Sequence, residues 1–240
     1  MSGVKQLEAL QRRRIAWKSL VKILAFVLGY FALSALCLVR WHLRGHWLGL
    51  DFFSGSYLLL KGLGSIQSLY SARHVFRSET LRKEWWGMTS DPNIVRLTQL
   101  LMMGDLIIFL DYSHWQSLRS LARPMIQAAG LAIYVVAKLW QMWTDVRLAR
   151  YFGNAGSGQH EFMKDGPYRF VRHPRYASLI AGKIGCALIF ASAWGWFMAL
   201  AWTILYTRKV VHEEEHMRQL LGASYNDYSR ETARLLPGVY

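Results

Sequence analysis

Acidic residues, cysteine and proline are scarce in this chain of 240 residues. Asp and Glu number 15 against 29 Lys and Arg, so the formal net charge is +14. Charged residues make up 18% of the chain and hydrophobic residues 53%, which excludes a disordered chain. The two cysteines, Cys37 and Cys186, lie in apolar segments and indicate neither a disulfide nor a metal site. A basic and apolar chain with 11 Trp favours a membrane protein over one that binds nucleic acid.

Apolar segments recur along the chain at the length of membrane spans, which need about 20 mostly apolar residues. They cover residues 19–39, 47–70, 94–112, 124–143 and 177–206. The last is too long for one crossing, so we expect two helices that turn near residues 193–196. The sequence therefore predicts an all-α, multi-pass transmembrane helical bundle of about six spans, including a C-terminal helical hairpin.

The basic residues predict the orientation of this bundle. Outside the spans, Lys and Arg gather on one side, in the N-terminal segment, in the connection after the second span, and in the segments that follow the fourth and sixth. The opposite side receives only Arg40, Arg44, Arg119 and Arg123. Because Lys and Arg are enriched in cytoplasmic loops, we expect both termini on the cytoplasmic face. The long basic N-terminus is not typical of a cleaved signal peptide.

Ionisable residues within the spans are functional candidates, because a bilayer disfavours charge. Lys138 and Lys183 lie near the cytoplasmic ends of their spans, and we expect them to extend toward the interface. Asp105 and Lys61 lie deeper, and a pairing between them is open.

The tail contains a string with competing interpretations, His212-Glu213-Glu214-Glu215-His216. It matches the zinc-protease pattern H-E-x-x-H, for which His173 would have to supply a third ligand. Together with Arg218 it also resembles the intramembrane glutamate proteases, but the later histidine motifs of that family are missing. A structural interpretation is that the glutamates begin a tail helix, where acidic residues favour the helix dipole. We predict no metal site.

The loop before the hairpin reads Gly166-Pro-Tyr-Arg-Phe-Val-Arg-His-Pro-Arg-Tyr176. Its Gly-Pro step predicts a turn, and Pro174 suits the first position of a helix. Arg172, His173 and the first free amides of that helix would converge on an anion. Tyr168 and Tyr176 add rings that can flank a base or a sulfonium. The alternative is a basic and aromatic loop that docks on anionic lipid headgroups.

Loop and tail together resemble the integral-membrane methyltransferases of the isoprenylcysteine carboxyl methyltransferase and phospholipid methyltransferase superfamily. That pattern is G-P-Y-x-x-x-R-H-P-x-Y, a hairpin, E-E-x-x-L, F-G-x-x-Y-x-x-Y and a closing proline. The matching residues here are Gly166–Tyr176, Glu213-Glu214, Leu221–Tyr228 and Pro237. Met217 replaces the leucine of the third element. The match covers roughly Tyr151–Tyr240, and the first spans carry no motif of the family.

The resemblance implies a cytoplasmic site for S-adenosylmethionine between the loop, the hairpin and the tail. The cofactor-binding residues that it implies are Tyr168, Arg172, His173, Pro174, Tyr176, Glu213 and Glu214. The family's substrate-binding arginine corresponds to Lys209, with Arg208 beside it. We therefore expect Arg208, Lys209 and Glu213 to act on the methyl acceptor.

The expected activity is methyl transfer to a lipophilic or lipidated acceptor, with carboxyl O-methylation of a prenylcysteine-like substrate favoured. One alternative is N-methylation of a phospholipid amine, although a glycine-x-glycine step is missing before Arg150. Another is an NADPH-dependent enzyme similar to sterol reductases, although Ala177-Ser178-Leu179 lacks the glutamate typical of that group. We expect residues 1–143 to bind the acceptor, residues 144–240 to form the catalytic region, and membrane lipids to be the other partners.

Overall fold

The computed structural model describes residues 25, 28–38, 51–77, 92–154 and 163–238. The predicted all-α class is confirmed for these residues, whose only β-pairing is an isolated bridge between Val171 and Ala233. The N-terminal basic segment, Arg40 and Arg44 lie outside the described residues, so the structure does not test their predicted sides.

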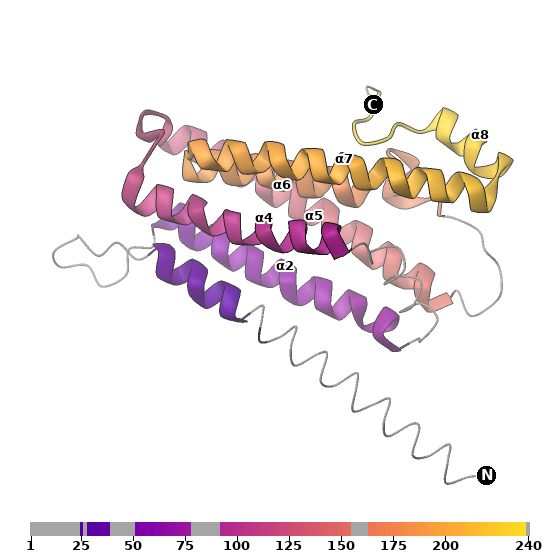
Figure 1. Ribbon diagram of the computed structural model, residues 1–240, viewed down its shortest axis with the longest axis horizontal. Coiled ribbons are helices and arrows are strands. Elements are labelled where there is room, and N and C mark those ends of the chain that lie inside the picture. The colour runs from indigo at the N-terminus through magenta and orange to yellow at the C-terminus, as the bar shows by residue number, and fades with distance from the viewer. Residues whose placement is uncertain (1–24, 26–27, 39–50, 78–91, 155–162, 239–240) are drawn as a thin grey trace, which may run out of the picture.

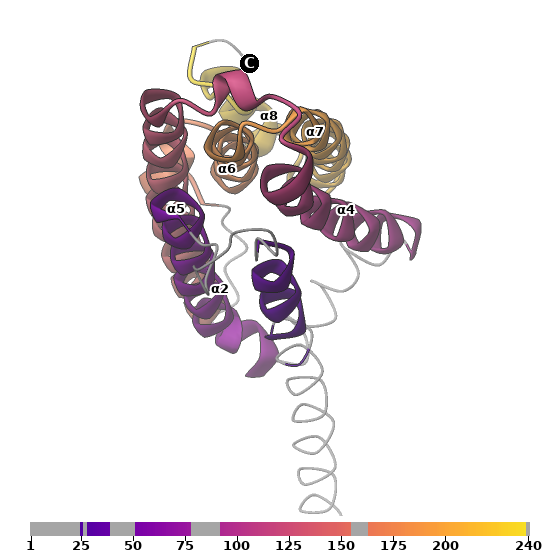
Figure 2. The ribbon, with the colours of Figure 1, turned by 90° about the vertical axis from the view of Figure 1, so that its left-hand side faces the viewer.

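Long helices run side by side along the longest axis of the molecule (Figure 1). They are Leu28–Leu38, α2 (Phe52–Arg77), α4 (Pro92–Leu110), α5 (Pro124–Asn154), α6 (Pro174–Phe190) and α7 (Ala193–Leu221). Two short turns, η1 (Asp111–Trp115) and η2 (Arg119–Leu121), connect α4 to α5. The loop helix η4 (Gly166–Arg169) precedes α6, and α8 (Ala223–Glu231) follows α7. Viewed along the bundle, α2 and α5 lie on one side, α4 on the other, and α6 and α7 between them (Figure 2).

The predicted hairpin is formed by α6 and α7, and its turn lies at Ala191 and Ser192, just before the predicted position. Ala191 adopts a left-handed conformation with φ of 42°, which ends α6. Ser192 caps α7 by accepting a hydrogen bond from the Gly195 amide at 3.1 Å. Its hydroxyl also donates to the buried carboxylate of Asp111. The hairpin turn is therefore fixed to the end of the bundle opposite the loop that precedes α6.

One expectation about the tail was wrong. The glutamates at 213–215 do not begin a separate tail helix, because α7 continues without interruption to Leu221. At 1.5 Å per residue its 29 residues span about 43 Å. The same helix therefore carries apolar residues of the hairpin and the acidic residues of the site.

Glycines bring α5 and α6 into backbone contact. A Cβ on Gly130 would lie 2.8 Å from the Ile189 nitrogen and 2.9 Å from the Gly185 oxygen. A Cβ on Gly185 would lie 2.8 Å from the Gly130 oxygen. Small residues allow such close approach between helices in membranes. This contact lies near the start of α5 and the end of α6, and it holds the two helices together close to the hairpin turn.

Among the described helices, one passes a membrane-span test of length and composition, namely Pro124–Leu148 within α5. Several of its large apolar side chains are exposed, including Val136 at 64% and Leu139 at 57%. These exposed side chains suit contact with lipid. The count of six spans is not established by this single helix and stays a prediction.

The interior of the bundle combines aromatic packing with buried charge. Phe109 and Phe190 are fully buried and pack edge to face with ring centroids 5.2 Å apart. Asp105 is buried and pairs with Lys183, not with Lys61. The expectation that Lys183 extends to the interface was therefore wrong, since its ammonium group is held by Asp105 inside the bundle.

Candidate functional site

The predicted catalytic region includes the end of the bundle where α5 and α7 end and α6 begins (Figure 1). The loop before α6 pairs with the tail after α8. The Arg172 amide donates to the Ala233 oxygen at 2.8 Å, and the His173 amide donates to the Arg234 oxygen at 3.1 Å. Pro174 is fully buried at the first turn of α6 and needs no hydrogen-bond partner for its nitrogen. Loop and tail thus close over the end of the hairpin together.

Glu214 is the electrostatic centre of this region. Its side chain is 0% exposed, and its carboxylate contacts four basic side chains. Arg172 Nε lies at 2.9 Å, Arg234 Nη2 at 2.9 Å, Arg218 Nη2 at 3.2 Å and His173 Nε2 at 3.3 Å. Burial alone would raise the pKa of Glu214, but the contacts from His173, Arg172 and Arg234 hold that pKa well below its usual range. Glu214 is therefore an ionised carboxylate that joins the loop, α7 and the tail.

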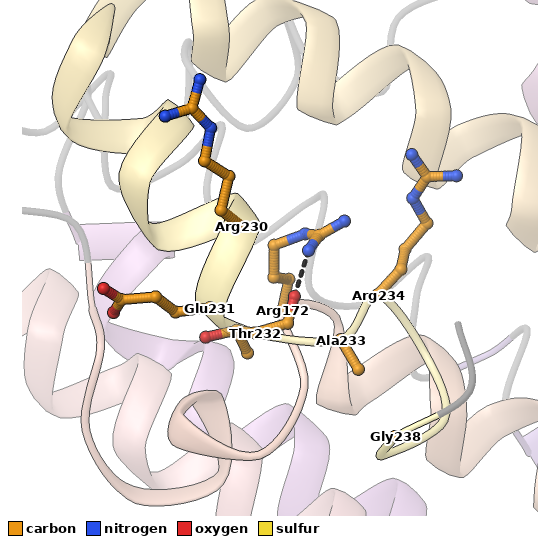
Figure 3. Close-up of a pocket in the computed structure, with 7 residues that line it drawn as sticks. All are labelled: Arg172, Arg230, Glu231, Thr232, Ala233, Arg234 and Gly238. Atoms are coloured by element: carbon orange, nitrogen blue, oxygen red, sulfur yellow. Dashed lines mark hydrogen bonds between the residues drawn. The ribbon is translucent and has the colours of Figure 1, made fainter.

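Arg172 connects the same three segments through its guanidinium group. Besides Glu214, it donates to the Ser229 oxygen at 2.6 Å and to the Thr232 oxygen. Figure 3 shows the bond to Thr232 between Arg230 and Arg234. The predicted cofactor residue Arg172 is thus bound to protein through its Nε and Nη1 atoms.

His173, Tyr176 and Glu213 form a second group beside Glu214. The Tyr176 hydroxyl donates to Glu213, and His173 Nδ1 lies 3.9 Å from Glu213 Oε2. His173 Nε2 is buried and, within the described part of the chain, makes no well-directed hydrogen bond even to the nearby Glu214. A polar ligand with donors or acceptors could satisfy this nitrogen.

The two candidate acceptor-binding cations differ in position. Lys209 lies with its Nζ 5.8 Å from the centre of the Tyr176 ring, and it is four residues before Glu213 on the same helix face. Burial lowers the pKa of Lys209, while the charge of Glu213 acts in the opposite direction. Arg208 is exposed and lies on another face. The structure therefore brings Lys209, and not Arg208, to the predicted site.

Tyr168 lies in the loop helix η4, and its backbone oxygen accepts a hydrogen bond from the Tyr228 hydroxyl at 2.7 Å. Burial raises the pKa of Tyr168, so the phenol stays protonated. The charges of Arg175, Asp145 and Glu213 also act on this phenol.

Sequence reasoning missed two charged residues of this region. Arg175 Nε lies 3.1 Å from Asp145 Oδ1, and Asp145 is 5% exposed on α5. The signal available in the sequence was the carboxylate of Asp145, two residues after the apolar segment 124–143. This pair links α5 to the first turn of α6.

The zinc interpretation has no geometric support. His212 and His216 are both exposed on α7, and His173 packs instead against Glu213 and Glu214. Among the residues that the structure describes, no three His, Cys, Asp or Glu side chains gather as metal ligands.

An open depression of about 440 Å³ lies beside the tail (Figure 3). Its lining residues are Arg172, Arg230, Glu231, Thr232, Ala233, Arg234 and Gly238. Of the predicted site residues it contains only Arg172, so it does not coincide with the group around His173 and Glu213.

Comparison with known proteins matches this part of the chain to one family. A family model described as phospholipid methyltransferase matches residues 124–224, which run from the start of α5 into α8. A probable protein-S-isoprenylcysteine O-methyltransferase of Oryza sativa subsp. indica is 21% identical over 160 residues, 60% of this chain and 82% of the relative. The protein-S-isoprenylcysteine O-methyltransferase of Dictyostelium discoideum is 24% identical over 86 residues, 34% of this chain and 35% of the relative. Residues 124–224 are thus identified as a methyltransferase region of this membrane family.

A further relative is named for a different methyl acceptor. The methanethiol S-methyltransferase of Mycobacterium tuberculosis is 26% identical over 196 residues, 75% of this chain and 76% of the relative. The reductase alternative is set aside, because the family transfers methyl groups.

Methyltransferases of this family use S-adenosylmethionine. The residues present fit such a cofactor, because His173 Nε2 is a buried polar atom without a well-directed partner among the described residues. Glu213 and the Tyr176 hydroxyl lie beside it and offer an acidic partner for an amino group. Lys209 and Tyr206 both lie against Tyr176 and extend the site toward the interior of the bundle.

Proposed function

We propose that this methyltransferase acts on an amphiphilic acceptor and that its favoured reaction is carboxyl O-methylation of a prenylcysteine-like substrate. The observation that carries the proposal is the position of Lys209 beside Tyr176 and Glu213. An ammonium group there can orient a carboxylate by charge. The isoprenylcysteine O-methyltransferases among the relatives support this choice of acceptor.

The cofactor would be held by His173, Tyr176 and Glu213, with Tyr168 and Pro174 forming the adjoining wall. When bound, S-adenosylmethionine supplies an activated methyl group. Glu214 and Arg172 act by holding loop and tail together, which orients His173 and limits entry of water. Excluding water leaves an acceptor oxygen less solvated and therefore more nucleophilic. A carboxylate acceptor has no proton to lose, so it needs no general base.

A second candidate reaction is S-methylation of a thiol. It is favoured by the methanethiol S-methyltransferase match, which extends over three quarters of both chains. A thiol must lose its proton to become a nucleophile. Glu213 is the carboxylate within the predicted site that is placed to accept such a proton. N-methylation of a phospholipid amine would need the same proton transfer.

The proposed cofactor site is tested by isothermal titration of the purified protein in nanodiscs with S-adenosylmethionine. We expect binding to the unchanged protein and at least tenfold weaker binding to His173→Ala. His216→Ala is the matched control, because that histidine is exposed on α7. Absence of binding to the unchanged protein, or equal effects of the two substitutions, would overturn the proposed site.

The acceptor is tested by competition between an S-farnesylcysteine analogue, methanethiol and phosphatidylethanolamine for a labelled methyl donor. Carboxyl methylation yields a base-labile methyl ester, whereas a thioether or methylamine is stable to base. We expect mainly the ester, and Lys209→Met should raise the KM for the carboxylate more than it lowers kcat. If label is found only in the thioether, the proposal of carboxyl methylation is wrong and the reaction is S-methylation.

We further infer a six-span arrangement with residues 1–143 binding the acceptor and with the site and both termini on the cytoplasmic face. The alternating directions of α2, α4, α5, α6 and α7 support this arrangement (Figure 1). Reporter fusions at each connection test it. Cytoplasmic signals from the connections before α4 and α6, and periplasmic or lumenal ones from the connection between α4 and α5, are expected. The reverse pattern would refute this orientation.

A further inference from the structure

Lysine side chains from three different helices enter the interior of the bundle. They are Lys61 on α2, Lys138 on α5 and Lys183 on α6. All are partly buried, and the Lys183 side chain is 19% exposed. Ionisable residues in membrane bundles face the interior or a polar cavity and mark sites where ligands or ions bind. We call these side chains the core lysine site.

Carboxylates do not balance the charge of this site. Asp105 is the ion-pair partner of Lys183. Lys61 instead donates to the Tyr30 hydroxyl at 2.6 Å, and Lys138 donates to Gln141 Oε1 at 2.9 Å. Within the described ranges, no carboxylate lies at ion-pair distance from Lys61 or Lys138. In the core lysine site, basic side chains therefore outnumber the carboxylates at ion-pair distance.

Aromatic rings surround the ammonium group of Lys61. Its Nζ lies 4.4 Å from the centre of the Tyr30 ring, 5.4 Å from that of Tyr57 and 5.6 Å from that of Phe109. Ring faces attract a cation, but they do not neutralise its charge. They hold the ammonium group in place without supplying a counter-ion.

The lysines are close enough to act together. A Cβ on Gly64, about one helical turn after Lys61, would lie 3.7 Å from Lys138 Nζ. The helices that carry them adjoin one another, with α2 beside α5 and α6 beside both (Figure 2). A single anion could therefore interact favourably with more than one of these groups.

A column of aromatic rings joins the core lysine site to the catalytic region. Lys183 Nζ lies 4.5 Å from the centre of the Trp202 ring, which stacks on Tyr206 with centroids 5.2 Å apart. Tyr206 in turn lies 5.4 Å from Tyr176, whose hydroxyl donates to Glu213. Ligands in the two sites would thus occupy opposite ends of one contact chain between α6 and α7.

We propose that the core lysine site binds the anionic head group of an amphiphile, a carboxylate or a phosphate. Such a group would supply the missing negative charge, and Lys ammonium groups bind both kinds of anion as point charges. An apolar chain on the ligand would lie among the surrounding helices. Binding of this amphiphile at the lysines does not depend on the proposed function, in which the acceptor carboxylate lies beside Lys209.

The test is titration of the full-length protein in detergent, without cofactor, with three probes that share a farnesyl chain. N-acetyl-S-farnesylcysteine carries a carboxylate, its methyl ester is neutral, and farnesyl phosphate carries a phosphate. We expect at least one anionic probe to bind about tenfold more tightly than the ester, as for a hydrogen bond to a charged group. The tighter of the two anionic probes identifies the source of the head group.

Lys61→Gln and Lys138→Gln should each lose most of that preference while keeping the affinity for the ester, which reports an intact fold. Arg119→Gln removes the same charge from an exposed residue in the connection between α4 and α5 and should leave the preference unchanged. Titration of the same preparations with S-adenosylmethionine separates a failed anion site from a failed cofactor site. Equal binding of acid, phosphate and ester, or an unchanged preference in both lysine variants, would overturn the proposal.

Discussion

Replacing Glu214 by glutamine tests whether one buried carboxylate holds the catalytic region together. The side chain is fully buried and contacts Arg172 and Arg234 at 2.9 Å each. The substitution would leave these guanidinium groups, which are 9% and 21% exposed, without their carboxylate. Removing one partner of a buried ion pair costs about 3–5 kcal/mol. We take the lower end, about 3 kcal/mol, because glutamine still offers an acceptor oxygen.

The assay is thermal unfolding of the purified protein in detergent. For a chain of this size, about 3 kcal/mol corresponds to a midpoint lowered by roughly 6–12 °C. Glu215→Gln is the matched control on the neighbouring position. Its side chain is 59% exposed and lies 3.6 Å from Arg218, so we expect a change within about 0.5 kcal/mol. Equal midpoints for the two variants would refute the role given to Glu214.

Three further predictions concern packing, pH and the cofactor. Gly130→Ala should lower the free energy of unfolding by about 1–3 kcal/mol through overpacking, which is measured as a lower unfolding midpoint. Gly55→Ala, with no atom within 4 Å of its Cβ, should not lower it. Because the pKa of Glu214 is lowered, its stabilisation should be complete above about pH 4.3 and should decline as pH falls further. Unfolding midpoints measured from pH 7 to pH 3 should show this decline in the unchanged protein and a smaller one in Glu214→Gln. Tyr176→Phe removes the bond to Glu213 and should weaken S-adenosylmethionine binding about tenfold in calorimetry; unchanged affinity would contradict that role.

Local sequence signals were sufficient to predict the loop and the hairpin. Gly166 and Pro167 form the turn, with a positive φ of 60° at the glycine, and Pro174 begins the following helix as expected. The continuation of α7 was missed because the apolar pattern ends near Tyr206. The residues that follow are nonetheless mostly good helix formers, and the first glycine is Gly222. Propensity alone would therefore have predicted the longer helix.

Contacts between distant segments could not be predicted in the same way. Asp105 had several lysines as possible partners, and no local pattern favours Lys183, which is 78 residues away. The choice between Arg208 and Lys209 required the phase of α7, because only the continuous helix places Lys209 on the face of Glu213. The grouping of His173 with Glu213 and Glu214 came from the resemblance to a family, and the structure brings these residues together.

Two backbone amides of the loop can report how often the tail separates from it. The amides of Arg172 and His173 are protected only by carbonyl groups of the tail, at Ala233 and Arg234. Their hydrogen-exchange rates therefore report how often the tail separates from the loop. The Ala177 amide, which donates to the His173 oxygen inside the same helical turn, reports the opening of α6 instead. Comparing these amides therefore measures how often the tail separates from the loop relative to the opening of α6.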